Sequence, residues 1–152
     1  MNGENEARNR LYRLALSKLS RTDVTPRALY AYLLEKKPEA EHELAKEVVR
    51  ELAREGFVNE SKSYQALMDE GERKHWGPLK LKAELNRRSF SPACLRRFER
   101  ESIDWEERAA ACVTERPDSP EELRRACARL MSRGFDRGTA MSVLCSCEAE
   151  NE

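Results

Sequence analysis

The chain has 152 residues, 37% of them charged and 39% hydrophobic, and its 28 basic and 28 acidic residues cancel to a formal net charge of zero. This length suits one domain with a core of its own. No apolar run approaches the roughly 20 residues of a membrane-spanning helix, and residues 1–10 are polar, so we expect a soluble, cytoplasmic protein. The abundance of charge favours small, well-solvated helical units over one thick interior.

Apolar residues recur with the helical period of 3.6 along almost the whole chain, and no segment alternates with period 2 for long enough to predict a strand. We therefore expect an all-α fold. In residues 1–58 the pattern predicts helices around residues 11–19, from Thr25-Pro26 to Pro38, and from Glu41 to Glu55 before Gly56.

The same pattern of a capping residue, proline and apolar stripe returns twice further along the chain. Predicted helices of residues 59–103 begin at Asn59 or Ser61, at Gly77-Pro78 and at Ser91-Pro92. Those of residues 104–152 begin at Asp104, Ser119-Pro120 and Asp136. We expect residues 1–5 and 148–152, the latter a short acidic tail, to be disordered.

The similar patterns of these three groups of helices indicate a degenerate repeat. Aligning the middle helix of each group matches Leu33 with Leu85 and Leu130, then Lys36 with Arg88 and Arg133, then Pro38 with Phe90 and Phe135. A unit of this size cannot bury its own apolar stripes, so we expect three three-helix repeats (residues 1–58, 59–103 and 104–152) to stack into an elongated, curved array with an exposed groove.

Charge is unevenly divided along the chain despite the neutral total. Residues 73–100 hold nine basic and two acidic residues, a net +7, and residues 8–27 carry +5, whereas residues 101–152 carry −5. A polyanion or an acidic protein surface suits the basic middle, although a solvated face is the ordinary role of any single cation. The candidate partner-binding residues are Arg73, Lys74, Trp76, Lys80, Lys82, Arg87, Arg88, Arg96 and Arg97. Arg87, Arg88, Arg96 and Arg97 flank one turn, so we expect them to form one patch.

Two residue types leave alternatives open. Trp76, in a basic loop, suits stacking on a base or a partner surface as well as packing between repeats, whereas Trp105, on an apolar stripe, is expected in the core. Five cysteines without a CxxC pair indicate reduced thiols; a metal site from Cys145, Cys147 and a distant histidine is the weaker reading. We expect no metal and no cofactor.

Catalysis finds little support in the sequence. His42 and His75 have no neighbouring nucleophile, and no glycine-rich phosphate loop is present. The sequence therefore predicts a protein that binds a partner and is not an enzyme.

Two blocks in the middle of the chain resemble a known family. Gly56-Phe57-Val58-Asn59-Glu60 with Tyr64, followed by Trp76-Gly77-Pro78-Leu79-Lys80-Leu81-Lys82-Ala83-Glu84-Leu85 and Phe90-Ser91, resembles the RecX regulators of the RecA recombinase. The resemblance extends over about residues 8–145. The chain departs from the family pattern at Ala28, at Asn59-Glu60 and at Gln65, none of which is an expected core position.

The resemblance implies a three-repeat helical protein that binds RecA assembled on single-stranded DNA. Such a protein lies along the groove of the filament and restrains its growth, ATP hydrolysis and strand exchange. Separately, the basic residues lead us to expect weak contact with single- or double-stranded DNA. We expect a monomer. Two alternatives remain: a direct nucleic-acid binder that uses the helix after Gly77-Pro78, and a helical adaptor for some other protein.

Overall fold

The computed structural model describes residues 2–37 and 42–149. Within these ranges the chain forms nine α-helices and no strand, which confirms the predicted all-α class. The helices are α1 (Asn2–Arg21), α2 (Pro26–Lys36), α3 (His42–Arg54), α4 (Glu60–Arg73), α5 (Pro78–Arg87), α6 (Pro92–Glu99), α7 (Trp105–Ala110), α8 (Pro120–Ser132) and α9 (Arg137–Ala149).

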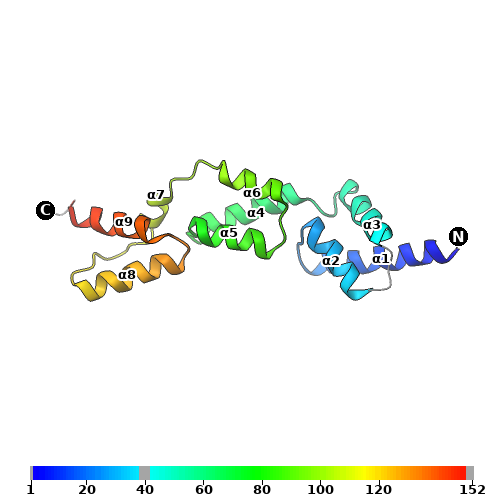
Figure 1. The fold of residues 1–152 in the computed structure, drawn as a ribbon, viewed down its shortest axis with the longest axis horizontal. Coiled ribbons are helices and arrows are strands. Elements are labelled where there is room, and N and C mark those ends of the chain that lie inside the picture. Colours follow the sequence, from blue (N-terminus) through cyan, green and yellow to red (C-terminus); the bar gives the residue numbers. More distant parts are fainter. Residues whose placement is uncertain (1, 38–41, 150–152) are drawn as a thin grey trace. The chain divides into compact units, whose positions relative to one another are not determined.

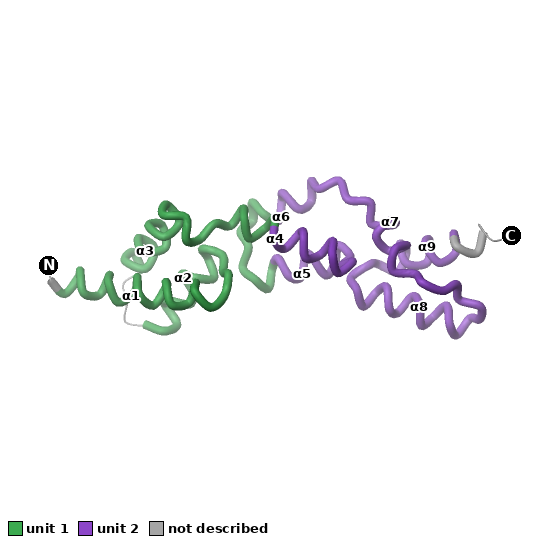
Figure 2. The backbone as a smooth tube through the Cα atoms, turned by 180° about the vertical axis from the view of Figure 1, so that it is seen from behind, with its two compact units in different colours: residues 1–65, 86–94 green, residues 66–85, 95–152 purple. Residues whose placement is uncertain are grey.

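The chain divides into two compact units (Figure 2), and the division passes through α4, α5 and α6. Unit 1 comprises residues 1–65 and 86–94, and unit 2 comprises residues 66–85 and 95–152. In unit 1, α1, α2 and α3 pack on one another; in unit 2, α9 packs against both α7 and α8 (Figure 1). The three sequence ranges proposed as repeats stay a prediction.

Each unit has its own apolar core. In unit 1, Leu11 and Ala15 of α1 meet Leu29 and Leu33 of α2 and the apolar face of α3. The core of unit 2 is made by these residues of α7, α8 and α9 and the turn between the last two: Ala109, Ala126, Cys127, Leu130, Phe135, Ala140, Val143 and Leu144. The three leucines aligned from the sequence are all buried, at 0% exposure for Leu33 and Leu85 and 3% for Leu130.

Five helices begin as the sequence predicts, with a capping side chain. The side-chain oxygens of Thr25, Asn59, Asp104, Ser119 and Asp136 each accept a hydrogen bond from the backbone N–H three residues further on. This bond satisfies one of the orphan donors of a first helical turn. Of the two alternatives for the start of α4, the structure selects Asn59.

The C-terminal ends of four helices share a left-handed residue followed by an apolar one. Gly56, His75, Ser89 and Gly134 have φ values of 85°, 56°, 60° and 99°. After Gly56, His75 and Gly134, the next N–H bonds to a carbonyl five residues earlier, which closes the helix end as in a Schellman motif. The sequence indicated this only for Gly56, because histidine and serine rarely adopt positive φ.

The prediction of disordered ends is wrong for residues 2–5 and 148–149, which are helical. Residues 1 and 150–152 lie outside the described residues, as do the predicted boundaries at Pro38 and Glu41.

Candidate interaction surface

A junction in unit 1 joins the start of α2 to the turn that follows α5. The Thr25 hydroxyl lies 3.2 Å from the carbonyl oxygen of Arg88 and 3.1 Å from that of Ser89, while it also caps α2. Beside it, the Ser63 hydroxyl donates a 2.8 Å hydrogen bond to the Asp23 carboxylate. Thr25 is 2% exposed, so these bonds are made away from water and hold α2 against the turn.

An equivalent junction in unit 2 joins the start of α5 to the turn after α8. The backbone N–H of Gly77 donates to the carbonyl of Arg133 at 2.8 Å, and that of Leu79 donates to Gly134 at 2.9 Å. The backbones approach so closely that a Cβ on Gly77 would lie 2.4 Å from the Gly134 carbonyl. A Cβ on Gly134 would lie 2.5 Å from the backbone nitrogen of Lys80. Only glycine fits at either position.

Two arginines reinforce the unit 2 junction. The Arg133 guanidinium donates to the carbonyl oxygen of Lys74 at 2.8 Å, and the Arg108 guanidinium donates to that of Trp76 at 3.0 Å. Burial lowers the pKa of Arg108, whose charge is partly withdrawn from solvent. The basic position at Arg133, which the sequence alignment matched with Lys36 and Arg88, therefore serves packing within this unit.

Trp76 packs inside unit 2, which is the packing alternative of the two that the sequence left open. Its side chain is only 9% exposed. The ammonium groups of Lys74 and Lys80 lie 5.3 Å and 5.0 Å from the centre of its ring, as in cation–π pairs. A base that stacked on this ring would have to displace them. Trp105 is partly buried against the unit 2 core, in agreement with the sequence analysis.

Several of the predicted cations already have carboxylate partners within unit 2. Lys74 pairs with Glu70 at 2.8 Å, Lys82 with Glu99 at 3.9 Å, and Arg97 with Glu101 at 4.0 Å. Arg73 and Arg96 are exposed. Arg87 and Arg88 belong to unit 1 and Arg96 and Arg97 to unit 2, so a single patch formed by these four stays a prediction.

A second basic cluster, not singled out from the sequence, surrounds Tyr32 in unit 1. The ammonium groups of Lys18 and Lys36 lie 4.9 Å and 5.9 Å from the centre of its ring. The Arg21 guanidinium lies 3.3 Å from its hydroxyl. The sequence signal was the +5 charge of residues 8–27, but the meeting of α1 with α2 at Tyr32 follows only from tertiary packing.

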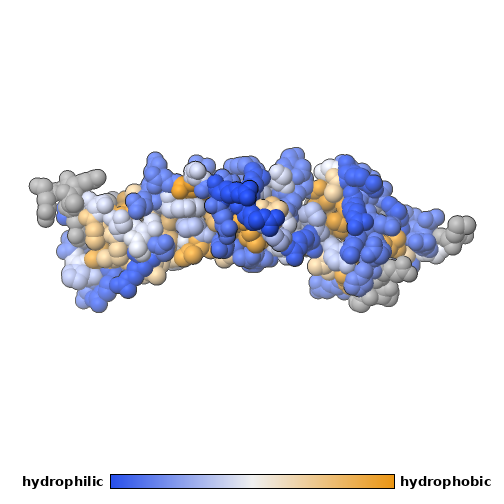
Figure 3. All heavy atoms as spheres, turned by 45° about the horizontal axis from the view of Figure 1, so that its top comes forward, coloured by the Kyte–Doolittle hydropathy of each residue, from blue (hydrophilic) through white to orange (hydrophobic). Residues whose placement is uncertain are grey.

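The face drawn in Figure 3 carries many hydrophilic residues, interspersed with pale and hydrophobic areas. The exposed large apolar side chains among the described residues are Phe57 in unit 1 and Leu79 and Met131 in unit 2.

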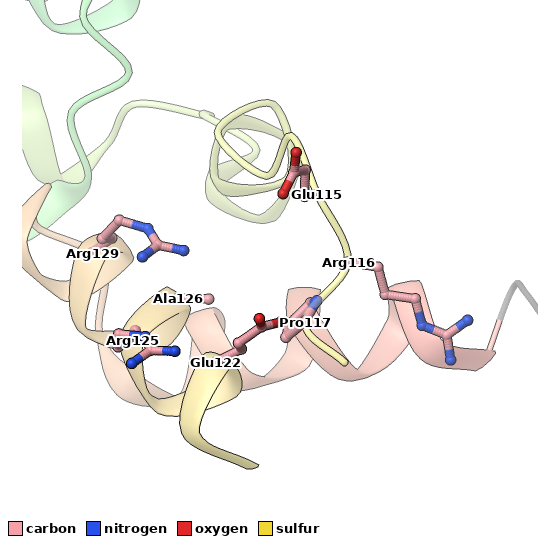
Figure 4. A pocket seen from close by; sticks show the side chains of 7 residues that line it. All are labelled: Glu115, Arg116, Pro117, Glu122, Arg125, Ala126 and Arg129. Carbon is pink, nitrogen blue, oxygen red and sulfur yellow. The ribbon is translucent and has the colours of Figure 1, made fainter. Parts of the chain in front are cut away.

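A hollow of about 190 Å³ lies between α8 and the loop that precedes it (Figure 4). Its lining mixes both signs of charge: Glu115, Arg116, Pro117, Glu122, Arg125, Ala126 and Arg129. The Glu122 carboxylate accepts the backbone N–H of Asp118, while the Arg116 side chain points away from the hollow (Figure 4). The lining brings together no nucleophile with a base.

Of the described cysteines, Cys94 and Cys127 are buried, Cys112 is partly buried and Cys145 is exposed, and the Cys94 thiol donates a 3.0 Å hydrogen bond to the Glu60 carboxylate. Burial raises the pKa of Cys112, which disfavours a reactive thiolate. Within the described residues, no three His, Cys, Asp or Glu side chains are placed to hold a metal ion. The side chain of Cys147, part of the weaker metal hypothesis, lies outside them. No helix in the described ranges is long and apolar enough to cross a membrane.

Solved structures with this arrangement of helices include two RecX proteins. The crystal structure of RecX from Lactobacillus salivarius matches with a TM-score of 0.78 at 14% sequence identity, over 95% of this chain and 99% of that one. This chain has the all-α fold of RecX. A crystal structure of the regulatory protein RecX matches at 0.72 and 11% identity, over 95% of this chain and 74% of that one. No family model and no curated protein matches the sequence.

Proposed function

We propose that this protein is a RecX-like regulator that binds the RecA filament on single-stranded DNA and inhibits its extension, ATP hydrolysis and strand exchange. The observation that carries the proposal is the likeness to the RecX crystal structures over 95% of the chain. The sequence blocks that resemble RecX point to the same family.

The residues that carry the sequence resemblance also have structural roles. Gly56 ends α3 in the left-handed conformation, and the Trp76-Gly77-Pro78 block forms the start of α5 at the unit 2 junction. A shared scaffold with RecX is the natural reason for these matches. The binding surface is a separate part of the proposal, because the RecX-like blocks include few of the exposed cations.

For that surface we retain the exposed cations of the middle of the chain. Arg73, Arg87, Arg96 and Arg97 expose their side chains, whereas Trp76 is packed and Arg88 is half-buried beside the unit 1 junction. Exposed cations suit either an acidic protein surface or DNA phosphates.

The test of the proposal is the rate of DNA-dependent ATP hydrolysis by RecA. Addition of this protein in amounts stoichiometric with RecA should slow hydrolysis and filament extension. An R87E/R96E/R97E variant should lose this effect because it reverses three exposed charges, whereas R124E/R129E/R137E, with the same change of charge on α8 and α9, should keep it. Unchanged hydrolysis with the wild-type protein would refute the proposal, and equal loss in both variants would refute the proposed surface.

The alternative, direct binding to nucleic acid, is separated from this proposal by a gel shift in the absence of RecA. Tight binding at physiological salt favours the alternative. Weak binding that vanishes with modest salt is what a filament-directed protein should show, because screening removes isolated phosphate contacts first.

A further inference from the structure

We propose that unit 1 carries a binding site for the phosphodiester backbone of a nucleic-acid strand, formed by the basic side of α1 and the cluster around Tyr32. This site, called here the α1 stripe, consists of Arg10, Arg13, Lys18, Arg21, Tyr32 and Lys36. It differs from the surface proposed for RecA and does not depend on that function.

Among the described residues, the cations of the α1 stripe have no carboxylate partner. Arg8, two residues before Arg10 on α1, is held by Glu47 at 3.6 Å and also by Glu51, whose pKa it lowers. Beyond Arg8 the chain has no acidic residue before Asp23. Asp23 itself accepts the Ser63 hydroxyl. The cations of the α1 stripe form no ion pair with any described residue, in contrast to Lys74, Lys82 and Arg97.

Three cations of the α1 stripe converge on one ring. Lys18, Arg21 and Lys36 approach Tyr32 from two helices, at 4.9 Å and 5.9 Å for the ammonium groups and 3.3 Å for the guanidinium. Three like charges gathered around one ring repel one another, and the ring only partly offsets this repulsion. An anion bound among them would remove it, which makes this the most favourable anion position in the cluster.

Four cations of the stripe follow one another along one side of α1. With 3.6 residues per turn, Arg10, Arg13, Lys18 and Arg21 fall within a sector of about 140° and are separated by roughly 4.5, 7.5 and 4.5 Å along the axis. Arg10, Arg13 and Arg21 are exposed. A row of cations in this arrangement matches a polymer with regularly repeated negative charge better than it matches a single small anion.

The side chains between the cations favour nucleic acid over an acidic protein. Ser17 and Ser20 are exposed on α1, and hydroxyls together with Lys and Arg are the common partners of backbone phosphates. A protein interface is usually centred on an aromatic or apolar anchor that the partner buries, whereas the one aromatic ring of the stripe, Tyr32, is already covered by Lys18 and Lys36. The exposed large apolar residue described in unit 1 is Phe57, which follows α3 and is not part of the stripe.

The experiment measures binding of a fluorescent single-stranded oligonucleotide by anisotropy at several salt concentrations, with no RecA present. The variant K18Q/R21Q/K36Q should bind roughly tenfold to hundredfold more weakly at low salt, and the slope of log K against log salt should fall in magnitude by about 2, since three contacts are lost. The matched control R124Q/R129Q/R137Q removes the same charge from unit 2 and should bind as the wild type does. Circular dichroism should show the same helicity in all three proteins.

Two competitors identify the ligand. An unlabelled oligonucleotide should displace the labelled strand, whereas a mononucleotide at the same phosphate concentration should not, because the stripe requires linked charges. Equal displacement by the mononucleotide would overturn the assignment to a strand, and equal displacement by polyglutamate would reassign the stripe to an acidic protein.

The single variant K36Q, at the exposed end of α2, provides a milder test that leaves α1 intact. It should reduce the salt slope by about 0.7. Wild-type affinity and slope in both K36Q and the triple variant, or equal weakening by the control, would overturn the proposal. Because RecA is absent, this result is independent of the ATPase test.

Discussion

The unit 1 junction and the unit 2 junction connect the same kinds of structural position, but they do so through different chemical groups. In each, the residue before the N-terminal proline of a helix meets the turn that follows a later helix: Thr25 meets Ser89 in unit 1, and Gly77 meets Gly134 in unit 2. A side-chain hydroxyl makes the connection in unit 1. Backbone N–H and carbonyl groups make it in unit 2.

This difference shows how a degenerate repeat can keep a contact while its residues diverge. In unit 1 a side-chain hydroxyl spans the distance between the helix start and the turn. In unit 2 the two backbones are in direct contact, so glycine is required. A substitution at Thr25 should therefore cost unit 1 only one or two hydrogen bonds and a small part of its stability. A substitution at Gly77 or Gly134 should instead create a steric clash in unit 2 and a larger loss of stability.

Gly134→Ala should be the most damaging substitution. Its φ of 99° and the 2.5 Å approach of a new Cβ to the Lys80 backbone add backbone strain to overpacking. We expect a loss of about 3 to 5 kcal/mol in the free energy of unfolding, measured by urea denaturation. Gly138→Ala, in α9 with only one side-chain atom 3.4 Å away, is the control and should be neutral or slightly stabilising. A small effect at Gly134 would show that the unit 2 junction can open.

Leu33→Ala and Leu130→Ala should each cost about 2 to 5 kcal/mol, because both side chains are buried and leave a cavity. If the two units are separately packed, hydrogen exchange should increase in α1–α3 for the first variant and in α8–α9 for the second. Met131→Ala, which alters a residue 47% exposed, is the control and should change little. Equal increases in both units for either buried variant would contradict the division.

Thr25→Val should weaken the unit 1 junction by about 1 to 2 kcal/mol, because valine keeps the shape but loses the cap and the bond to the turn. Thr25→Ser retains the hydroxyl and should lose less. Thermal denaturation of the two variants compares them directly. If Thr25→Val lost as much stability as Gly134→Ala, the proposed contrast between hydrogen bonding in unit 1 and steric exclusion in unit 2 would be wrong.

Ser89→Gly should make the unit 1 turn resemble that of unit 2. Glycine relieves the strain of the left-handed conformation at φ 60°, but it also raises the conformational entropy of the unfolded chain. The net effect should stabilise the folded protein by about 0.5 to 1 kcal/mol. Ser132→Gly, at the end of α8, is the control and should destabilise. A loss at Ser89 would indicate that its side chain contributes to the turn.

Acid should weaken the cap of α9 but not that of α2. Hydrogen bonds from Thr139 hold the pKa of Asp136 below its ordinary value of 3.8, whereas Thr25 does not titrate. Because the folded-state pKa is depressed, the stabilisation is present above pH 3.8 and is lost as the pH falls through the folded value. The stability difference between wild type and Asp136→Ser should shrink over that range, and a constant difference would contradict the role of the carboxylate.

Parts of the fold could be predicted because they depend on neighbours in the sequence. Caps at Thr25, Asp104 and Ser119 act three residues ahead, and the buried leucines follow the helical period. The left-handed turns at His75 and Ser89 were missed because their residue types carry no such signal. The carboxylate partners of Lys82 and Arg97 were missed because a count of charges does not show which of them pair.

The sequence alone determined the all-α class, the starts of four capped helices (α2, α7, α8 and α9) and the uneven charge, since each follows from the order of residues along one chain. Only the tertiary structure decided what those residues do. Packing buried Trp76, placed Arg133 on a backbone carbonyl and brought Lys18, Arg21 and Lys36 to one tyrosine. The physical reason is that burial and ion pairing depend on residues distant in sequence, whose approach is fixed only when the helices pack.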